Sequence, residues 1–334
     1  MTNVALCIPI RNEAAHLSDL LGALGRQAMA GLRVTLCLFF DACVDDSHRI
    51  VAEHAASLPL ALCHRAGIAG PPNAGKARAT AMSLGVDTLG DDGGLLLTTD
   101  ADGMPADDWI ARTCAALLAA DVVAGRIVRL PYPPCPAQDR LEAYYDRLYA
   151  LRRVIDPVAW EGAETHHCTG GANMGFTAAA YAALGGFRSL PHGEDARIAD
   201  DAARLGLRVR RDATCIVHTS SRRSGRVAGG MAEMLRQQDA SAEIHVGDPR
   251  DAVWQYGRQA QARRAFEIGR PAEIGGALGL TADHAIGVAR DCPNAEAFAM
   301  RIVPAAPDSP RSISLERAEV LLAMIDAERI DVLA

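Results

Sequence analysis

Runs of apolar residues alternate with amphipathic stretches along the first part of the chain. Apolar runs of strand length lie at residues 4–10, 32–40, 60–63 and 95–99. Apolar residues at helical spacing follow the first run, as at Leu17, Leu21 and Leu24. Because strands that alternate with helices form parallel βαβ units, we expect a Rossmann-like α/β sheet flanked by helices.

The middle of the chain alternates less regularly. We expect a helix over 105–120, beginning at Pro105, and a strand over 122–128. The segment 165–176 is too rich in glycine to predict a regular element. The last expected strands lie at 207–211 and 214–218.

Only helical patterns remain beyond about Gly230, including the apolar spacing of 318–325. We therefore expect two domains. Residues 1–230 form an α/β domain with a mostly parallel mixed sheet, and residues 231–334 form a helical C-terminal extension.

The composition indicates a soluble globular protein, with 49% hydrophobic and 22% charged residues. A net charge of −7 argues against nucleic-acid binding, which requires a basic face. No apolar run is long enough to span a membrane, and no signal peptide precedes the first strand. The nine cysteines contain no C-x-x-C pair, which favours a reducing compartment. We expect a cytoplasmic protein, and peripheral attachment to a membrane stays open.

The strongest candidate for chemistry is the stretch 95–103, where a buried strand runs into Asp100-Ala101-Asp102-Gly103. Acidic groups at the carboxyl end of an α/β strand lie where such sheets bind ligands. Two close carboxylates repel each other unless a cation separates them, and Mg²⁺ or Mn²⁺ prefers oxygen ligands. The pattern predicts a metal–diphosphate site; the alternative is an ordinary surface turn.

Acidic residues also follow the first two strands, at Glu13 and Asp41. Parallel strands end at one edge of a sheet, so these carboxylates and Asp100 can meet there and hydrogen-bond a base and a ribose. Three unrelated loop carboxylates are the alternative.

The segment 70–77, Gly-Pro-Pro-Asn-Ala-Gly-Lys-Ala, nearly matches a phosphate-binding P-loop. It ends in Ala77, which has no hydroxyl for magnesium, and Pro71 and Pro72 lack the N–H groups that cradle phosphate. Lys76 remains a candidate contact to a phosphate or a base. The alternative is a flexible connection with a solvated lysine.

Gly193-Glu194-Asp195 opens a predicted helix. Acidic residues are favoured there by the helix dipole, but one of these carboxylates could also accept the proton of an acceptor hydroxyl. His218 closes a predicted strand and could complete a metal shell, or simply be packed. Arg222, in the polar run 219–226, could neutralise a diphosphate, or lie in a solvated loop.

Taken in order, these motifs resemble those of the family 2 glycosyltransferases, which have the GT-A fold. The similar segments span roughly residues 3–230 and are Pro9–Glu13 (P-x-x-N-E), Asp41–Ser47, Gly75–Ala77, Asp100–Gly103 (DxD), Gly170–Asn173, Gly185–Phe187, Gly193–Asp195 (ED) and His218. Cys43 departs from the family pattern, where Ser or Gly is usual. The Q-x-x-R-W run of processive synthases is also missing, which suggests a single transfer.

The resemblance implies a UDP- or GDP-linked sugar donor, a hydroxyl acceptor and inversion at the anomeric carbon. It implies that Asp195 is the base, with Glu194 as the second candidate. Asp102 and His218 would ligate Mg²⁺ or Mn²⁺, with Asp100 facing the metal and the ribose. The remaining donor-binding candidates are Pro9, Arg11, Glu13, Asp41, Lys76, Ala101 and Arg222.

Two other functions stay open at this point. A P-loop-like phosphotransferase would depend on Lys76. A non-catalytic nucleotide-sugar-binding protein would bind nucleotide without turnover. The sugar, the acceptor, the oligomeric state and the role of residues 231–334 are not determined by these motifs.

Overall fold

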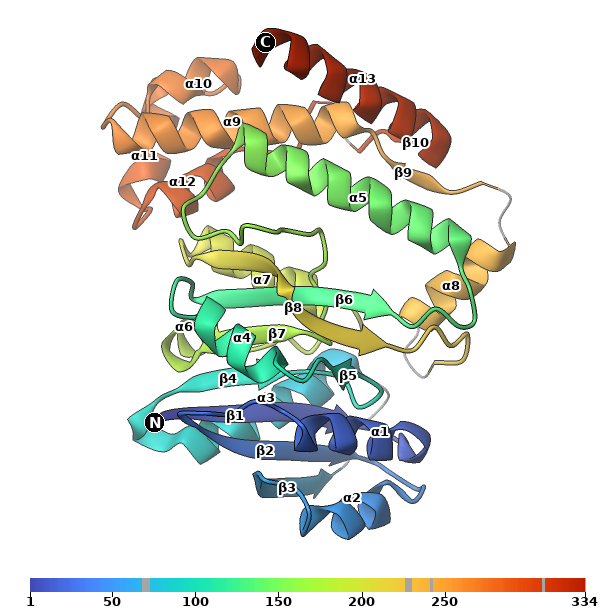
Figure 1. The fold of residues 1–334 in the computed structure, drawn as a ribbon. Coiled ribbons are helices and arrows are strands. Elements are labelled where there is room, and N and C mark those ends of the chain that lie inside the picture. Colours follow the sequence, from blue (N-terminus) through green and yellow to red (C-terminus); the bar gives the residue numbers. More distant parts are fainter. Residues whose placement is uncertain (68–72, 226–229, 241–242, 308–309, 334) are drawn as a thin grey trace.

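The structure, a computed structural model, describes residues 1–67, 73–225, 230–240, 243–307 and 310–333. Its centre is an eight-stranded sheet (Figure 1). In spatial order the strands are β3 (Ala61–Gly67), β2 (Leu32–Asp41), β1 (Thr2–Ile10), β4 (Leu95–Thr98), β7 (Met174–Thr177), β6 (Val122–Arg129), β8 (Val209–Thr219) and β5 (Met104–Pro105).

The sheet is mixed but mostly parallel. β1 pairs in parallel with β2 and β4, and β2 pairs in parallel with β3. β7 is antiparallel to both of its neighbours, and the short β5 is antiparallel to β8. The predicted α/β class is therefore confirmed, and the carboxyl ends of β1, β2 and β4 lie at one edge.

Helices cover both faces of the sheet (Figure 1). One face packs α1 (Ala14–Gly25), α2 (Ser47–Ala55) and α4 (Trp109–Ala116) through side chains such as Leu20, Val51 and Trp109. The other packs α3 (Ala74–Leu89), α6 (Ala178–Leu184) and α7 (Glu194–Arg204). A short 3₁₀ turn, Gly90–Asp92, precedes β4.

The C-terminal part packs on α5 (Pro136–Ile155), the long helix that follows β6 (Figure 1). Its helices are α8 (Met231–Ala240), α9 (Pro249–Glu267), α10 (Glu273–Ala277), α11 (Ala282–Arg290), α12 (Ala295–Ile302) and α13 (Leu315–Leu333). Helices α9 to α12 enclose a core around Ile274 and Phe298. A second core joins Leu148 of α5 to Leu322 of α13.

The expectation of helices alone beyond Gly230 is wrong, because β9 (His245–Gly247) and β10 (Ser312–Ser314) form an antiparallel pair. Each strand is three residues long and too short for a periodic signal. Among the described residues, no helix is both long and apolar enough to cross a membrane.

Three expectations for the middle of the chain are also corrected. Pro105 lies in β5 rather than at a helix start, and α4 begins at Trp109. The glycine-rich segment contains β7, where Gly175 allows α4 to approach: a Cβ there would lie 2.7 Å from the Thr113 methyl group. The two strands expected over 207–218 are the single strand β8.

An irregularity in β8 explains that last difference. Gly125 pairs with Asp212, whereas the next residue of β6, Arg126, pairs with Ile216, so β8 carries extra residues. The Asp212 side chain accepts hydrogen bonds from the Thr214 N–H and hydroxyl, which form a local turn. This turn interrupts the strand pattern in the sequence, so two strands were expected where there is one.

Candidate active site

A cavity of about 710 Å³ opens at the carboxyl edge of β1, β2 and β4. It is lined by most of the residues singled out in the sequence: Pro9, Arg11, Glu13, Asp41, Asp100, Ala101, Asp102, Glu194, Asp195 and Arg222. Segments far apart in the chain thus meet at one site, as parallel strand order requires.

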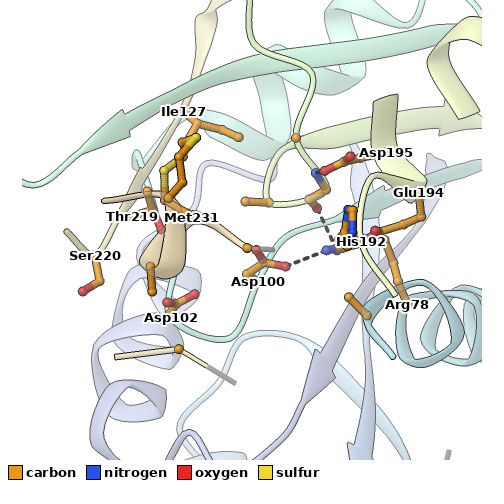
Figure 2. Close-up of a pocket in the computed structure, with 18 of the residues that line it drawn as sticks. Arg78, Asp100, Asp102, Ile127, His192, Glu194, Asp195, Thr219, Ser220 and Met231 are labelled. Atoms are coloured by element: carbon orange, nitrogen blue, oxygen red, sulfur yellow. Dashed lines mark hydrogen bonds and ion pairs between the residues drawn. The ribbon is translucent and has the colours of Figure 1, made fainter. Parts of the chain in front are cut away.

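The loop after β4 aims Asp100 and Asp102 into this cavity (Figure 2). Thr99 is fully buried, and its hydroxyl donates to the Ala172 carbonyl at 2.7 Å. Ala101 is 3% exposed and packs into the core between the two carboxylates. The Gly103 N–H then donates to the Asp100 carbonyl at 3.0 Å, closing the turn. The loop is therefore anchored at both ends.

Asp102 lies in an environment unfavourable to a charge. Burial, and then the negative charge of Asp100, raises the pKa of Asp102 to about 6, although Arg222 opposes the shift. The Arg222 guanidinium lies 3.0 Å from the Asp102 carboxylate. An ionised pair at Asp100 and Asp102 consequently lacks full charge compensation from the protein.

Two arginines bridge the loops on this edge. Arg222 donates to both carboxylate oxygens of Glu13, at 3.0 and 2.9 Å, in the bidentate geometry that guanidinium favours. Arg11 donates to Asp41 at 2.9 Å, and Asp41 is only 1% exposed. Arg222 with Glu13 and Arg11 with Asp41 are thus two charged pairs that line the cavity.

The residue at the centre of the site is Arg78, which was not among the predicted site residues. It comes from α3, is 5% exposed, and donates to Asp100 at 2.9 Å and to Glu194 at 3.1 Å (Figure 2). Two further donations reach the Thr98 hydroxyl at 3.2 Å and the Gly171 carbonyl at 2.8 Å. The DxD loop and the start of α7 are therefore joined by one buried guanidinium.

One feature of the sequence could have indicated Arg78. It is an arginine among small and apolar residues, on the side of α3 that the structure buries. Gly171 is the matching feature, because a Cβ there would lie 2.4 Å from the Arg78 guanidinium carbon. The glycine-rich segment therefore makes room for the arginine.

Glu194 and Asp195 have different surroundings. Glu194 is 3% exposed and held by Arg78; burial raises its pKa, and the arginine partly opposes the shift. Asp195 is half-buried and faces the cavity, with its carboxylate accepting from the N–H groups of Gly171 and Ala196 at 2.8 and 2.7 Å. Of the two, Asp195 is placed to meet a substrate.

Two predicted site residues do not line the cavity. Lys76 is exposed at the start of α3, and its backbone N–H donates to the Asn73 side chain at 2.8 Å. His218 lies in β8 between Val128 and Met104, while the next residue, Thr219, lines the cavity. Because successive strand side chains point to opposite faces, His218 is directed away from the cavity that Thr219 faces.

The P-loop-like segment is only partly described, since residues 70–72 lie outside the described ranges. In the described part, the Gly75 N–H donates to the Leu190 carbonyl at 3.1 Å, and a Cβ on Gly75 would lie 2.3 Å from the Arg188 carbonyl oxygen. Gly75 therefore serves close packing of loop 188–190, and its N–H is used within the protein.

Asp100 and Asp102 fit a divalent cation of the magnesium type. A bound cation would reduce the repulsion between these two carboxylates. Ions of this type bind one or two carboxylates together with water and phosphate oxygens. In the described part of the chain, no group of three His, Cys, Asp or Glu side chains could hold a metal ion. The protein would thus supply two ligands, and the substrate and water the rest.

The opposite wall carries a second polar group that the sequence did not predict. His167 lies 4.0 Å from the Cys168 sulfur through Nε2 and 2.7 Å from Asp146 through Nδ1. Burial opposes ionisation of Cys168, but the hydrogen bonds and charge of His166 and His167 outweigh it and lower the thiol pKa to about 6. For His167, burial is outweighed by Asp146 and Cys168, and its pKa rises to about 9.

No model of a protein family matches the chain, and no curated protein matches it in sequence. A crystal structure of S. aureus TarS 1–349 in complex with UDP-GlcNAc is similar over 90% of this chain and 88% of its own, with a TM-score of 0.50 and 13% identity. The mannosyltransferase PcManGT from Pyrobaculum calidifontis, in complex with GDP-Man and Mn²⁺, has a TM-score of 0.47 and 18% identity over 89% of this chain and 84% of that one.

The chain has the GT-A glycosyltransferase fold, as the motifs had led us to expect. At 13% identity this similarity extends to the fold alone. What the cavity does in this protein follows from its own residues.

Proposed function

We propose that the protein transfers a sugar from a UDP- or GDP-linked donor to an acceptor hydroxyl. The observation that carries this proposal is the placement of the Asp100–Asp102 pair and Asp195 on one cavity. The pair can bind a metal–diphosphate, and Asp195 can accept a proton. The TarS structure supports the proposal, because a protein of similar fold holds a sugar nucleotide.

On the donor side, the charged residues at this edge of the sheet would bind the nucleotide. Asp41 and Glu13 would accept hydrogen bonds from the nucleoside, with Pro9, Arg11 and Ala101 forming the adjacent wall. Asp100 and Asp102 would hold Mg²⁺ or Mn²⁺, which when bound would stabilise the charge that develops on the leaving diphosphate. Arg222 lies beside Asp102 and would neutralise part of the diphosphate.

On the acceptor side, Asp195 would take the hydroxyl proton as the oxygen attacks the anomeric carbon. Its two backbone N–H contacts fix its orientation. A base on the face opposite the leaving group would lead to inversion at the anomeric carbon. Glu194 would act as a positioning residue through Arg78, since it is buried and already bound.

The first test is thermal stability against a panel of nucleoside diphosphates, with and without Mn²⁺. A ligand of the folded state raises the melting temperature by mass action. We expect a Mn²⁺-dependent rise with UDP or GDP that is lost in Asp102→Ala and kept in Asp19→Asn, an exposed aspartate of α1. A rise with ATP alone would instead favour the phosphotransferase.

The second test is release of UDP or GDP from sugar donors in the presence of an acceptor panel. Asp195→Asn should lower turnover by about 10²–10⁴-fold, the usual contribution of a general base, while the nucleotide-induced shift in melting temperature persists. Binding without turnover by the unmodified protein would identify a non-catalytic nucleotide-sugar-binding protein.

A further inference from the structure

A second cavity, of about 220 Å³, lies where the sheet domain meets the C-terminal helices. Its walls come from α5, α7, β8, α9 and α12, and Thr169 lines both this cavity and the one described above. Four arginines line it: Arg152, Arg153, Arg211 and Arg263. We call it the arginine pocket.

Three of these guanidinium groups surround one aromatic ring. The guanidinium carbons of Arg152, Arg153 and Arg211 lie 5.4, 5.5 and 4.5 Å from the centre of the Tyr149 ring. Each attraction to the ring face is modest, whereas the three like charges repel one another. The Nε atom of each of the three is buried and has no hydrogen-bond partner among the residues that the structure describes. Orphaned buried donors of this kind are uncommon in native proteins.

The carboxylates in the wall are already engaged with other groups. Glu296 is paired with Arg263, which also pairs with Asp156, a residue outside the pocket lining. Glu161 lies 3.5 Å from Arg153. Asp200 accepts from Arg204 at 2.8 Å, and Arg204 does not line the pocket.

Arg152 and Arg211 therefore form no ion pair with any carboxylate in the described ranges. The Arg211 backbone N–H donates to the Glu161 carboxylate at 2.5 Å. The Arg152 guanidinium donates to Gln259 at 3.3 Å, and the Arg211 guanidinium donates to the Tyr149 hydroxyl at 2.5 Å and to Thr169 at 3.2 Å. The acceptors of both guanidinium groups are neutral. Among the described residues, four arginines but three carboxylates, Glu161, Asp200 and Glu296, line the pocket. The lining thus carries an excess of positive charge that a bound anion would offset.

We propose that the arginine pocket binds an oxyanion of the phosphate class. Guanidinium groups present paired N–H donors that match the oxygens of phosphate, and three of them with free Nε donors converge here. A water occupies about 30 Å³ in the liquid, so the pocket has room for a tetrahedral anion. The anion would be either free phosphate or the phosphate group of a small monoester.

The pocket also adjoins the proposed catalytic base. Helix α7 begins at Glu194 and contributes Ala196 and Ala199 to the wall, directly after Asp195. A bound anion would thus contact the helix that carries Asp195. None of the donor-binding residues named above lines the pocket, so this inference does not depend on the proposed function.

The test measures melting temperature in EDTA with increasing inorganic phosphate or glycerol phosphate, at ionic strength held constant with KCl. We expect a saturable rise of several degrees with at least one of them. The rise should be lost in Arg152→Gln and in Arg211→Gln. It should persist in Arg147→Gln, which removes the same charge from the exposed side of α5, where Arg147 pairs with Asp326.

The two ligands distinguish the source of the anion: a rise with phosphate supports the free ion, and a rise with glycerol phosphate alone supports a monoester. No saturable rise with either, or an equal rise in the pocket variants, would overturn the proposal. The variants should fold, since each removes a charge that has no ion-pair partner among the described residues. If one variant does not fold, the other variant and calorimetric titration of the unmodified protein with phosphate test the proposal. A UDP or GDP shift with Mn²⁺ that persists in the pocket variants separates this test from that of the donor site.

Discussion

At the scale of single residues, the site is defined by carboxylates in unequal surroundings. Asp102 is half-buried beside Asp100 and shares Arg222 with Glu13, whereas Asp41 pairs with Arg11. A protein that only needed stability would not keep a poorly compensated carboxylate there. A bound cation would offset the unfavourable energy of the ionised Asp102 carboxylate.

Asp102→Asn should therefore stabilise the metal-free protein. A pKa raised from 3.8 to about 6 corresponds to roughly 3 kcal/mol against the ionised form, and loss of the contact to Arg222 offsets part of this gain. We expect the free energy of unfolding to rise by about 1–2 kcal/mol in urea titrations at pH 8 with EDTA. Asp19→Asn serves as the control, and a loss of stability would mean that the Asp102–Arg222 pair is structural.

Arg78 is the residue whose removal should cost most. Arg78→Met leaves Glu194 buried without its partner, and breaking a buried pair on one side typically costs about 3–5 kcal/mol. Guanidinium denaturation would measure the loss. The double variant Arg78→Met, Glu194→Gln should recover part of it, because the uncompensated charge is gone; no recovery would locate the role of Arg78 at Asp100 instead.

Cys168 should react as a thiolate below neutral pH. With its pKa lowered to about 6, the thiol is protonated below that pH and ionised above it, so the rate of alkylation by iodoacetamide should rise through about pH 6. An ordinary cysteine would rise near pH 8.5. Peptide mapping after short exposures at pH 5, 6, 7 and 8 would follow the modification. His167→Ala should move the midpoint upward, and an unchanged midpoint would contradict the assignment.

At the scale of elements, close backbone approaches decide where glycine is required. Gly125 of β6 faces Asn173, which is fully buried and donates to the carbonyls of Arg126 and Cys215 at 2.9 Å each. Asn173 also accepts from the Trp109 indole at 2.8 Å. This asparagine ties together β6, β8 and α4 at the irregularity in β8.

Gly125→Ala should destabilise the protein by about 1–3 kcal/mol, the range for overpacking, because its Cβ would lie 2.4 Å from the Asn173 amide. Gly257→Ala is the matched control. Gly257 lies within α9 with nothing within 4 Å of its Cβ position, so the same change should stabilise by about 0.5–1 kcal/mol. Thermal unfolding of both variants would compare them; equal effects would contradict the close approach.

At the scale of the whole molecule, the C-terminal helices and the sheet domain share a core. Leu322 of α13 is fully buried with Leu148 and Leu151 of α5. Helix α5 precedes the expected boundary near residue 230, yet packs with the elements that follow it. The arginine pocket lies in the same junction.

Leu322→Ala should lower the free energy of unfolding by about 2–5 kcal/mol, as for other buried leucines. Val320→Ala, in the same helix and 57% exposed, should change it by less than about 0.5 kcal/mol. Far-UV and near-UV circular dichroism during denaturation would show whether one transition is affected. If Leu322→Ala behaves as Val320→Ala does, α13 does not contribute to the shared core.

The sequence by itself determined the parallel strands β1, β2 and β4 and the edge at which the carboxylates gather. Period and length identified β1, β2 and β4 because these strands are largely buried on both faces and consist mostly of apolar residues. The carboxyl ends of parallel strands lie at one edge of a sheet, so acidic residues that directly follow such strands are expected there. Glu13, Asp41, Asp100 and Asp102 could therefore be assigned to one site from the sequence, and all four line the cavity.

Only the tertiary structure decided which polar side chains complete the site. Arg78 donates to Glu194, 116 positions along the chain, and the arginine pocket combines residues of α5 with residues of α12. No local period marks such pairs. Lys76 and His218 show the converse: each lies within two residues of a lining residue in the chain, yet helix and strand geometry turn them out of the cavity. The period of a helix or strand depends on neighbouring residues and can be recognised in the sequence. The orientation and partners of a buried charged side chain depend instead on segments that are distant in the chain and pack against it.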